Sequence, residues 1–239
     1  MARTRPPIRA VVFDLDDTLY RERDYVLSGF RAVGRFLGRP GQLWAWMWRR
    51  FLAGRRTEMF DALSERFGLG LGPEGIRRLV EVYRTHRPTI RPCRGVVGLL
   101  RTLRRRRLRC GLLSDGYLPA QRLKLSALGI EGCFDAILFT EALGREAWKP
   151  SPRGFEAIRR RLQTPPHACA YVADNPAKDF LAPNQLGWLT VQWRRPNQLH
   201  ADNPPPAGGE PQKIVRTGPE LLRLLSAWRT GPVRRAGIR

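Results

Sequence analysis

The stretch Val11-Val12-Phe13-Asp14-Leu15-Asp16-Asp17-Thr18-Leu19-Tyr20 decides how the rest of the chain is interpreted. It opens with a short apolar run rich in β-branched residues, which predicts a buried strand, and this strand stops abruptly at a group of carboxylates. Acidic groups so close together repel one another and are costly beside an apolar core. A solvated acidic turn is the simple structural explanation, and a bound cation that offsets the repulsion is the functional one.

A magnesium ion would suit these carboxylates. Mg²⁺ prefers carboxylate and carbonyl oxygens, and it commonly takes only one or two protein carboxylates, with phosphate and water as its other ligands. If the extended backbone continues past the strand, Asp14 and Asp16 point to the same side and Asp17 points away. The choice between an acidic turn and a metal site therefore depends on matching residues elsewhere in the chain.

The composition is that of a globular protein. At 239 residues and 42% hydrophobic content, the chain can bury a good core, with room for a modest insertion. No apolar run reaches the ~20 residues needed to cross a bilayer, and no signal-peptide core follows the basic residues at the start. We expect a cytoplasmic protein with no membrane partner, either a monomer or a homodimer.

The cysteines and histidines are dispersed along the chain. None of the cysteines shows CxxC spacing, and each falls in or beside a predicted core element, so neither a disulfide framework nor a zinc site is indicated. We expect buried, reduced thiols. The residues concerned are Cys93, Cys110, Cys133 and Cys169, with His86, His167 and His200.

The net charge of +22 would ordinarily suggest an anionic partner such as nucleic acid. However, 39 of the 43 basic residues are arginine, which is typical of codon bias in a GC-rich genome, and they are spread along the whole chain. An incidental basic surface is the favoured interpretation, followed by a preference for small anionic substrates. We expect no specific nucleic-acid partner.

The segment that follows the acidic stretch is helical throughout. Apolar residues recur every three to four positions from Val26 to Leu37, and again over Trp44, Met47, Trp48, Phe51 and Leu52, whose stripe is interpreted as packing surface. About four helices and no strand are predicted before residue 90. The predicted division is therefore an α/β core of residues 1–20 and 91–239, interrupted by a small helical domain of residues 21–90.

From Pro92 onward, predicted strands and helices alternate. Strands are expected at residues 108–113, 136–140, 168–173 and 189–193, with helices between them, a long loop at 195–212 and a mobile basic tail at 229–239. The run Arg104–Arg107 is interpreted as the solvated end of a helix. This alternation predicts an α/β fold with a doubly wound, largely parallel, Rossmann-like sheet.

The polar residues of interest all follow predicted strands. Ligands of such sheets bind at the carboxyl ends of the strands. Asp14 and Asp16 follow the first strand, Ser114 the second and Asp174 a later one, while Lys149 lies in a loop expected at the same edge. Their convergence favours a functional site over unrelated turns.

The combination resembles the haloacid dehalogenase-like (HAD) superfamily, specifically its phosphatases with a helical C1-type cap inserted after the first motif. Asp14-Leu15-Asp16-Asp17-Thr18 is similar to the first motif, DxDxT, and Ser114 to the second. Lys149-Pro150-Ser151-Pro152 is similar to the third motif, and Asp174–Asp179 to the fourth, GDxxxxD. The chain departs from this pattern at Ala173, where glycine is usual, and at Pro183, in a helix that often carries small residues.

The resemblance implies a role for each of these residues. Asp14 would be the nucleophile that forms an aspartyl-phosphate, and Asp16 the general acid and base. Mg²⁺ would be held by Asp14, the main-chain carbonyl of Asp16, and Asp174. The phosphate site would comprise Thr18, Ser114, Asp115, Gly116 and Lys149, with Asp179 and Asn175 in support.

The expected function is a Mg²⁺-dependent phosphomonoesterase for a small phosphorylated metabolite such as a sugar phosphate or nucleotide. A dehalogenase is disfavoured because relatives with that activity usually lack an acid at the position of Asp16. Two alternatives stay open at this point: a phosphomutase built from the same motifs, and a non-catalytic protein that binds polyanions or nucleic acid on this fold.

Overall fold

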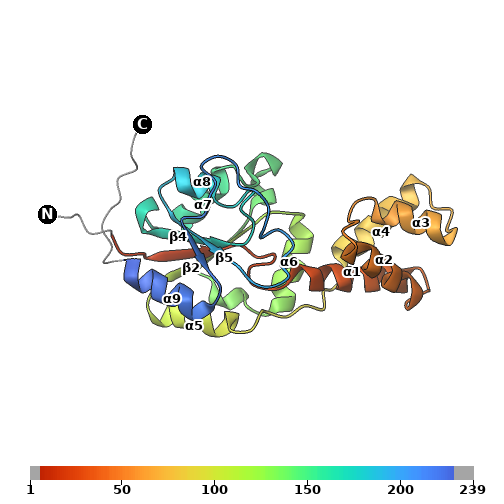
Figure 1. The fold of residues 1–239 in the computed structure, drawn as a ribbon, viewed down its shortest axis with the longest axis horizontal. Helices are drawn as coiled ribbons and strands as arrows, with labels where there is room; N and C mark the ends of the chain where they lie inside the picture. The colour runs from red at the N-terminus through yellow and green to blue at the C-terminus, as the bar shows by residue number, and fades with distance from the viewer. Residues whose placement is uncertain (1–5, 229–239) are drawn as a thin grey trace. The chain divides into compact units, whose positions relative to one another are not determined.

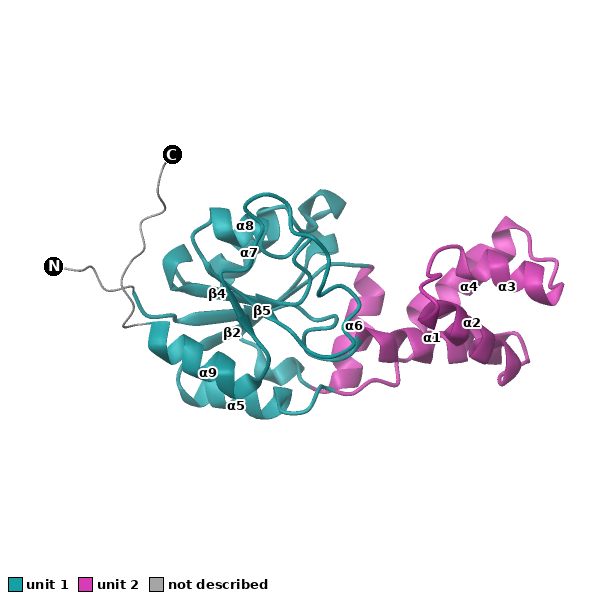
Figure 2. Cartoon of the chain, viewed as in Figure 1, with its two compact units in different colours: residues 1–21, 92–116, 130–239 teal, residues 22–91, 117–129 magenta. Residues whose placement is uncertain are grey.

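The computed structural model describes residues 6–228, and the chain forms two compact units (Figure 2). Unit 1 consists of the described residues within 1–21, 92–116 and 130–239, and unit 2 of residues 22–91 and 117–129. The segment Tyr117–Gly129, which the sequence assigned to the α/β core, is grouped with the helical unit. The basic tail predicted at 229–239 lies outside the described residues.

Unit 1 is built on a six-stranded sheet in which every neighbouring pair is parallel, in the order β3-β2-β1-β4-β5-β6. The prediction of a doubly wound parallel sheet is confirmed. Its central strands are buried along their whole length because helices cover both faces. The strands are β1 (Ala10–Phe13), β2 (Arg109–Ser114), β3 (Ala136–Phe139), β4 (Cys169–Ala173), β5 (Leu189–Trp193) and β6 (Lys213–Val215).

Helices α5 (Val96–Arg105) and α9 (Gly218–Ala227) lie on one face of this sheet, and α7 (Arg153–Arg161) and α8 (Leu181–Gln185) lie on the other (Figure 1). On the second face the ring of Phe155 meets Tyr171 edge-on at 4.9 Å and Trp188 at 5.7 Å between centroids. These contacts anchor α7 over β4. Short 3₁₀ turns occur at Glu131–Cys133, Thr140–Leu143, Arg145–Ala147 and Pro166–Ala168.

Unit 2 is built of helices only. Its helices are α1 (Glu22–Phe36), α2 (Gln42–Leu52), α3 (Met59–Phe67), α4 (Pro73–Thr85) and α6 (Leu118–Leu128). The predicted packing stripe of α2 is only partly correct, because Leu52 is 53% exposed and Trp44 and Trp48 are half-buried. The side chains of α2 that are buried belong to Leu43, Met47 and Phe51.

All four cysteines are free thiols, with Cys110 and Cys169 buried and the other two half-buried. Among residues 6–228, no helix is long and apolar enough to cross a membrane.

In unit 2, α1 and α4 pack so closely at one glycine that there is no room for a side chain there. A Cβ added at Gly29 in α1 would overlap the ring of Tyr83 in α4. That ring is held by edge contacts with Tyr25, at 5.6 Å, and Phe60, at 5.9 Å, so it cannot move aside freely. We expect Gly29→Ala to lower the free energy of unfolding by about 1–3 kcal/mol, measured by urea denaturation.

A matched variant separates this clash from the general effect of alanine in a helix. Gly98 lies inside α5 with open space around its Cβ position. Gly98→Ala should raise stability by roughly 0.5–1 kcal/mol, because alanine loses less backbone entropy. Stabilisation by both substitutions would show that the approach of α1 to α4 is not tight.

Candidate active site

The site forms where the chain changes direction across the sheet. From β1 the chain builds β2 and β3 on one side and β4, β5 and β6 on the other, so β1 and β4 flank the switch point. Asp14 follows β1 and Asp174 follows β4, and both side chains are buried. The ladder extends to Asp14, whose N–H donates to the carbonyl of Val172 at 3.0 Å. A switch point at the carboxyl ends of parallel strands is the expected place for a ligand.

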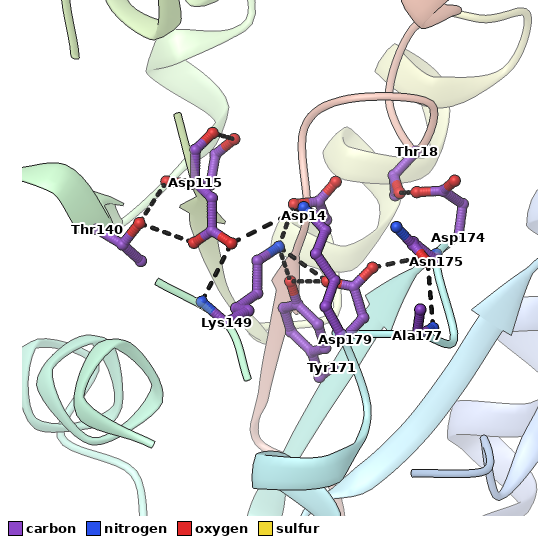
Figure 3. A network of polar contacts seen from close by, with 12 residues as sticks. Asp14, Thr18, Asp115, Thr140, Lys149, Tyr171, Asp174, Asn175, Ala177 and Asp179 are labelled. Carbon is purple, nitrogen blue, oxygen red and sulfur yellow. Dashed lines mark hydrogen bonds and ion pairs between the residues drawn. The ribbon is translucent and has the colours of Figure 1, made fainter. Parts of the chain in front are cut away.

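Lys149 is the centre of the polar network at this point (Figure 3). Its Nζ lies 2.5 Å from Asp14 Oδ1 and 2.8 Å from Asp179 Oδ1, and it donates to the Tyr171 hydroxyl at 2.9 Å. The lysine side chain has no exposed surface. One buried ammonium group therefore joins the end of β1, the strand β4 and the loop after β4.

Asp115 fixes the segment that carries Lys149. Its carboxylate accepts hydrogen bonds from Thr140 Oγ1 at 2.7 Å and from the backbone N–H of Lys149 at 3.1 Å. The neighbouring Ser114 is buried at the last position of β2. Gly116 has φ +119°, a conformation that favours glycine, so the backbone can turn sharply after the strand. The carboxylate of Asp115 thus has a structural role in addition to the phosphate-binding role predicted for this residue.

The acidic stretch turns immediately after Asp14. Residues 16–19 form a turn in which Leu19 N–H donates to the carbonyl of Leu15 at 3.0 Å. Asp14 and Asp16 were expected to share a side only if the extended backbone continued past the strand, and this condition is not met. Asp16 is half-buried and its carboxylate accepts a hydrogen bond from the Tyr20 hydroxyl, one turn later.

The loop after β4 is closed by its own side chains. Asp179 Oδ2 accepts from the backbone N–H of Asn175 at 3.1 Å, and Asn175 Oδ1 accepts from that of Ala177 at 3.1 Å. Thr18 Oγ1 lies 3.4 Å from Asp174 Oδ1, which connects this loop with the acidic stretch. Thr18 is therefore placed beside a predicted metal ligand. All ten residues predicted for the site belong to unit 1, at or near the carboxyl ends of its strands.

A second loop, residues 194–203, holds the acidic stretch in place. Gln198 Nε2 donates to the carbonyl of Asp17 at 2.8 Å, and the backbone N–H of Leu199 donates to Asp17 Oδ2 at 2.6 Å. Arg195 donates to the carbonyl of Thr18. These contacts explain how Asp17 keeps φ +53° while it is almost fully buried.

A comparison with known proteins identifies the family. The family model for haloacid dehalogenase-like hydrolases matches residues 8–187, which include every one of the residues described above for the predicted site. The chain belongs to this hydrolase family.

Curated relatives and solved structures are consistent with this assignment. A glyceraldehyde 3-phosphate phosphatase of Methanopyrus kandleri is 30% identical over 199 residues, which cover 79% of this hydrolase and 84% of the relative. A predicted phosphoglycolate phosphatase from Haemophilus somnus 129PT has a TM-score of 0.67 at 18% identity, covering 91% and 97% of the two chains. The L-2-haloacid dehalogenase of Xanthobacter autotrophicus has a TM-score of 0.59 at 22% identity, covering 92% and 98%.

The two structural neighbours show the fold alone, whereas the family model and the phosphatase relative bear on activity. This protein is a HAD-family hydrolase that acts on phosphate monoesters. The predicted family and enzyme class are confirmed, and the alternative of a non-catalytic binding protein is set aside.

The electrostatics of the hydrolase centre on Asp14. Burial raises the pKa of its carboxyl to about 7 from an ordinary value of 3.8, although Lys149 acts in the opposite direction; Asp179 and Asp16 raise it further. Burial opposes the charge on Lys149 too, but Asp14 and Asp179 together hold the pKa of this lysine well above 10.5. Lys149 therefore stays charged, and Asp14 is the group whose ionisation is sensitive to its surroundings.

The donor set at the switch point suits a hard divalent cation. Asp14 and Asp174 offer carboxylate oxygens from adjacent strand ends, and the raised pKa of Asp14 shows that Lys149 alone does not compensate its charge. Among residues 6–228, no three His, Cys, Asp or Glu side chains are grouped so that they would hold a metal ion. That is compatible with a Mg²⁺ site of two carboxylates and a main-chain carbonyl.

Three residues in the polar network around Lys149 and Asp115 were not predicted. Thr140 directly follows β3, so it carries the same signal as Ser114 and could have been found. Tyr171 lies inside a strand that reads as uniformly apolar, and nothing in the sequence distinguishes its hydroxyl. Lys178 was seen only as a spacer in the fourth motif, yet its Nζ lies 3.8 Å from Asp115 Oδ2.

Proposed function

We propose that this hydrolase is a Mg²⁺-dependent phosphomonoesterase that acts through a phosphorylated Asp14. The observation that carries the proposal is the position of Asp14: a buried carboxylate at the switch point, with the Lys149 ammonium group 2.5 Å from Oδ1. The Lys149 ammonium group donates to this carboxylate, and within residues 6–228 no backbone N–H donates to either of its oxygens. The carboxylate is thus available for attack on an electrophile. The positive charge of Lys149 favours an electrophile that is itself an anion, such as a phosphate ester.

In the first step, a carboxylate oxygen of Asp14 attacks the phosphorus of the ester. The new bond joins Asp14 to phosphorus, and the bond between phosphorus and the alcohol oxygen breaks with its electron pair on that oxygen. Asp16 gives its proton to the departing alkoxide, so the alcohol leaves neutral. The hydroxyl of Tyr20 orients the Asp16 carboxyl for this transfer, since it donates to Oδ1.

In the second step, water attacks the phosphorus of the aspartyl-phosphate. Asp16, now a carboxylate, takes a proton from this water, and the bond from phosphorus to Asp14 breaks with its electron pair returning to the carboxylate. Inorganic phosphate leaves, and both aspartates regain their starting protonation. Lys149 stabilises the negative charge on the phosphoryl oxygens throughout, while Asp179 orients its ammonium group at 2.8 Å.

Asp14, Asp174 and the main-chain carbonyl of Asp16 would hold the Mg²⁺ ion. When bound, this ion screens the repulsion between the Asp14 carboxylate and the phosphate dianion. Ser114 and the backbone N–H groups of Asp115 and Gly116 would bind phosphoryl oxygens. Thr18 keeps Asp174 in place through the contact between Oγ1 and Oδ1.

The substrate is proposed to be a small phosphorylated metabolite. The similarity to a glyceraldehyde 3-phosphate phosphatase over 79% of the chain supports a short phosphorylated sugar or sugar derivative ahead of a nucleotide. Unit 2 is proposed to be the cap domain that selects this substrate.

Removal of the metal tests this function. We expect phosphate release from p-nitrophenyl phosphate in the presence of Mg²⁺ to fall by at least about 100-fold in EDTA, and to return when excess Mg²⁺ is added. 2-Chloropropionate serves as the control substrate and should release no chloride. Phosphate release that is indifferent to EDTA, or chloride release, would contradict the proposal.

A further inference from the structure

A basic cavity lies at the amino-terminal ends of β1 and β2, whereas Asp14 lies at the carboxyl end of β1. It has a volume of about 650 Å³, and its described lining includes four arginines and no acidic residue. Arg9 precedes β1, Arg106 and Arg107 follow α5, and Arg109 begins β2. Arg9 and Asp14 are at opposite ends of one strand, about 16 Å apart at the usual rise per residue. The cavity is therefore separate from the catalytic edge.

The ends of two helices at this cavity are unusual for this chain. Five helices, α1, α2, α3, α6 and α8, are followed by a glycine at positive φ: Gly38, Gly54, Gly68, Gly129 and Gly187. Glycine is the common choice there because it adopts this conformation without strain. The corresponding residue is Arg107, at φ 59°, after α5 and Gln163, at φ 48°, after α7. Both of these long polar residues line the cavity.

The backbone hydrogen bonds confirm that these positions are equivalent to the glycine ones. After α5, Leu108 N–H donates to the carbonyl of Leu103 at 3.1 Å, and after α7, Thr164 N–H donates to that of Arg159 at 3.3 Å. These are the closing bonds of a helix that ends in a left-handed residue. Arginine and glutamine are thus present at two sites where glycine would be less strained, and the two sites face one cavity.

The positive charge of the cavity is not neutralised by the protein. The carboxyl-terminal ends of α5, α7 and α9 contribute roughly −0.5 each, so together about −1.5 against four guanidinium charges. Within residues 6–228, none of the four arginines forms an ion pair with a carboxylate. Arg106 instead donates to the hydroxyl of Ser226 at 2.9 Å. After the helix ends are compensated, about +2.5 charges are left over, so the arginines supply more positive charge than the helix ends need.

We propose that this cavity is a second anion site, which binds the phosphate chain of an oligophosphate such as tripolyphosphate or a nucleoside triphosphate. Guanidinium groups pair with phosphate oxygens through two parallel hydrogen bonds, and four of them match a chain of several charged groups better than a single phosphate. The volume is within the range of small-molecule sites. Gln163 and Ser226, which also line the cavity, add neutral hydrogen-bonding groups.

Calorimetry with tripolyphosphate tests the proposal on the full chain, in EDTA and ~150 mM salt, where long-range attraction is screened. The double variant Arg107→Gln/Arg109→Gln should weaken binding by at least about 10-fold. The matched variant Arg101→Gln/Arg105→Gln removes the same charge from exposed positions of α5 that do not line the cavity, and should change it less than about 2-fold. Both variants should hydrolyse p-nitrophenyl phosphate like the parent protein.

A single variant excludes misfolding as the cause of lost binding. Arg107→Gly should raise Tm, because it relieves the strained backbone, and at the same time weaken the binding of tripolyphosphate. Equal weakening by the cavity pair and the matched pair would overturn the proposal in favour of general charge attraction. A DNA duplex of about 20 base pairs that binds more tightly than tripolyphosphate would overturn it in favour of nucleic acid. Tighter binding of ATP than of tripolyphosphate would support the proposal and assign the site to nucleotides, and equal binding would support it for the inorganic chain.

Discussion

Replacing Asp14 by asparagine is expected to lower kcat for phosphate release by at least about 10⁴-fold, since an amide cannot form the phosphoryl bond and the remaining groups only position the substrate. The shape of the side chain is conserved, so binding of substrate should change much less than turnover. The measurement is steady-state hydrolysis of p-nitrophenyl phosphate at saturating Mg²⁺.

The same variant carries its own folding control. Because burial raises the pKa of Asp14 to about 7, well above its ordinary 3.8, the folded protein binds an extra proton between those values. Its stability therefore falls as the pH rises through that window. The amide of the substituted side chain cannot ionise, so Asp14→Asn should have a Tm at about pH 8 in EDTA that equals or exceeds that of the parent protein. An inactive variant with a clearly lower Tm would attribute the lost activity to structural damage.

Replacing Lys149 by methionine should affect both catalysis and folding. We expect kcat to fall by about 10²–10³-fold, since a charge aimed at the phosphoryl oxygens is lost. We also expect the free energy of unfolding at pH 8 to fall by about 3–5 kcal/mol, because two buried carboxylates, Asp14 and Asp179, lose the cation that lies within 2.8 Å of both. Urea denaturation and steady-state kinetics measure the two effects.

The pH dependence of this destabilisation distinguishes a lost charge from lost packing. Without Lys149, which lowers the pKa of Asp14, that pKa rises further and the carboxyl is protonated in the folded state at pH 5. The destabilisation should therefore be smaller at pH 5 than at pH 8. Lys178→Met is the matched control: its side chain is 38% exposed and 3.8 Å from its partner, so it should cost less than about 10-fold in kcat. Equal losses for the two lysines, or a destabilisation independent of pH, would argue against the central role of Lys149.

The fold and most of the site were predictable because their signals are local. The sequence alternates between the apolar periodicity of strands and that of helices, and this alternation specifies a parallel sheet. In such a sheet the strands that precede Asp14, Ser114 and Asp174 end on the same side, which brings these residues together. Lys149 could be assigned because a loop between two predicted elements must pass the same edge. Strands β1 to β5 were placed within one or two residues of their observed bounds, whereas the short edge strand β6 was not assigned as a strand.

The contacts that hold the site could not be predicted, because they join residues far apart in the chain. The loop 194–203 reads as polar and proline-rich, yet Gln198 and Leu199 bind Asp17 across more than 180 positions. A turn was one of the two explanations offered for the acidic stretch, but a solvated one was expected, and the burial of Asp17 depends on those same contacts. In the same way, the Tyr171 hydroxyl belongs to the polar network only because the fold places the Lys149 ammonium group 2.9 Å from it.

If Asp14 is phosphorylated during turnover, as proposed, the phosphorylated protein can be trapped. The protein is mixed with substrate and Mg²⁺, quenched in acid within one turnover, reduced with borohydride and digested with trypsin, which releases the peptide of residues 10–21. Reduction converts an aspartyl-phosphate to homoserine, so we expect homoserine at position 14 and unmodified Asp16 and Asp17, identified by tandem mass spectrometry. Homoserine at another position, or an unmodified peptide from a sample that has demonstrably accumulated the intermediate as a burst of released alcohol, would contradict it.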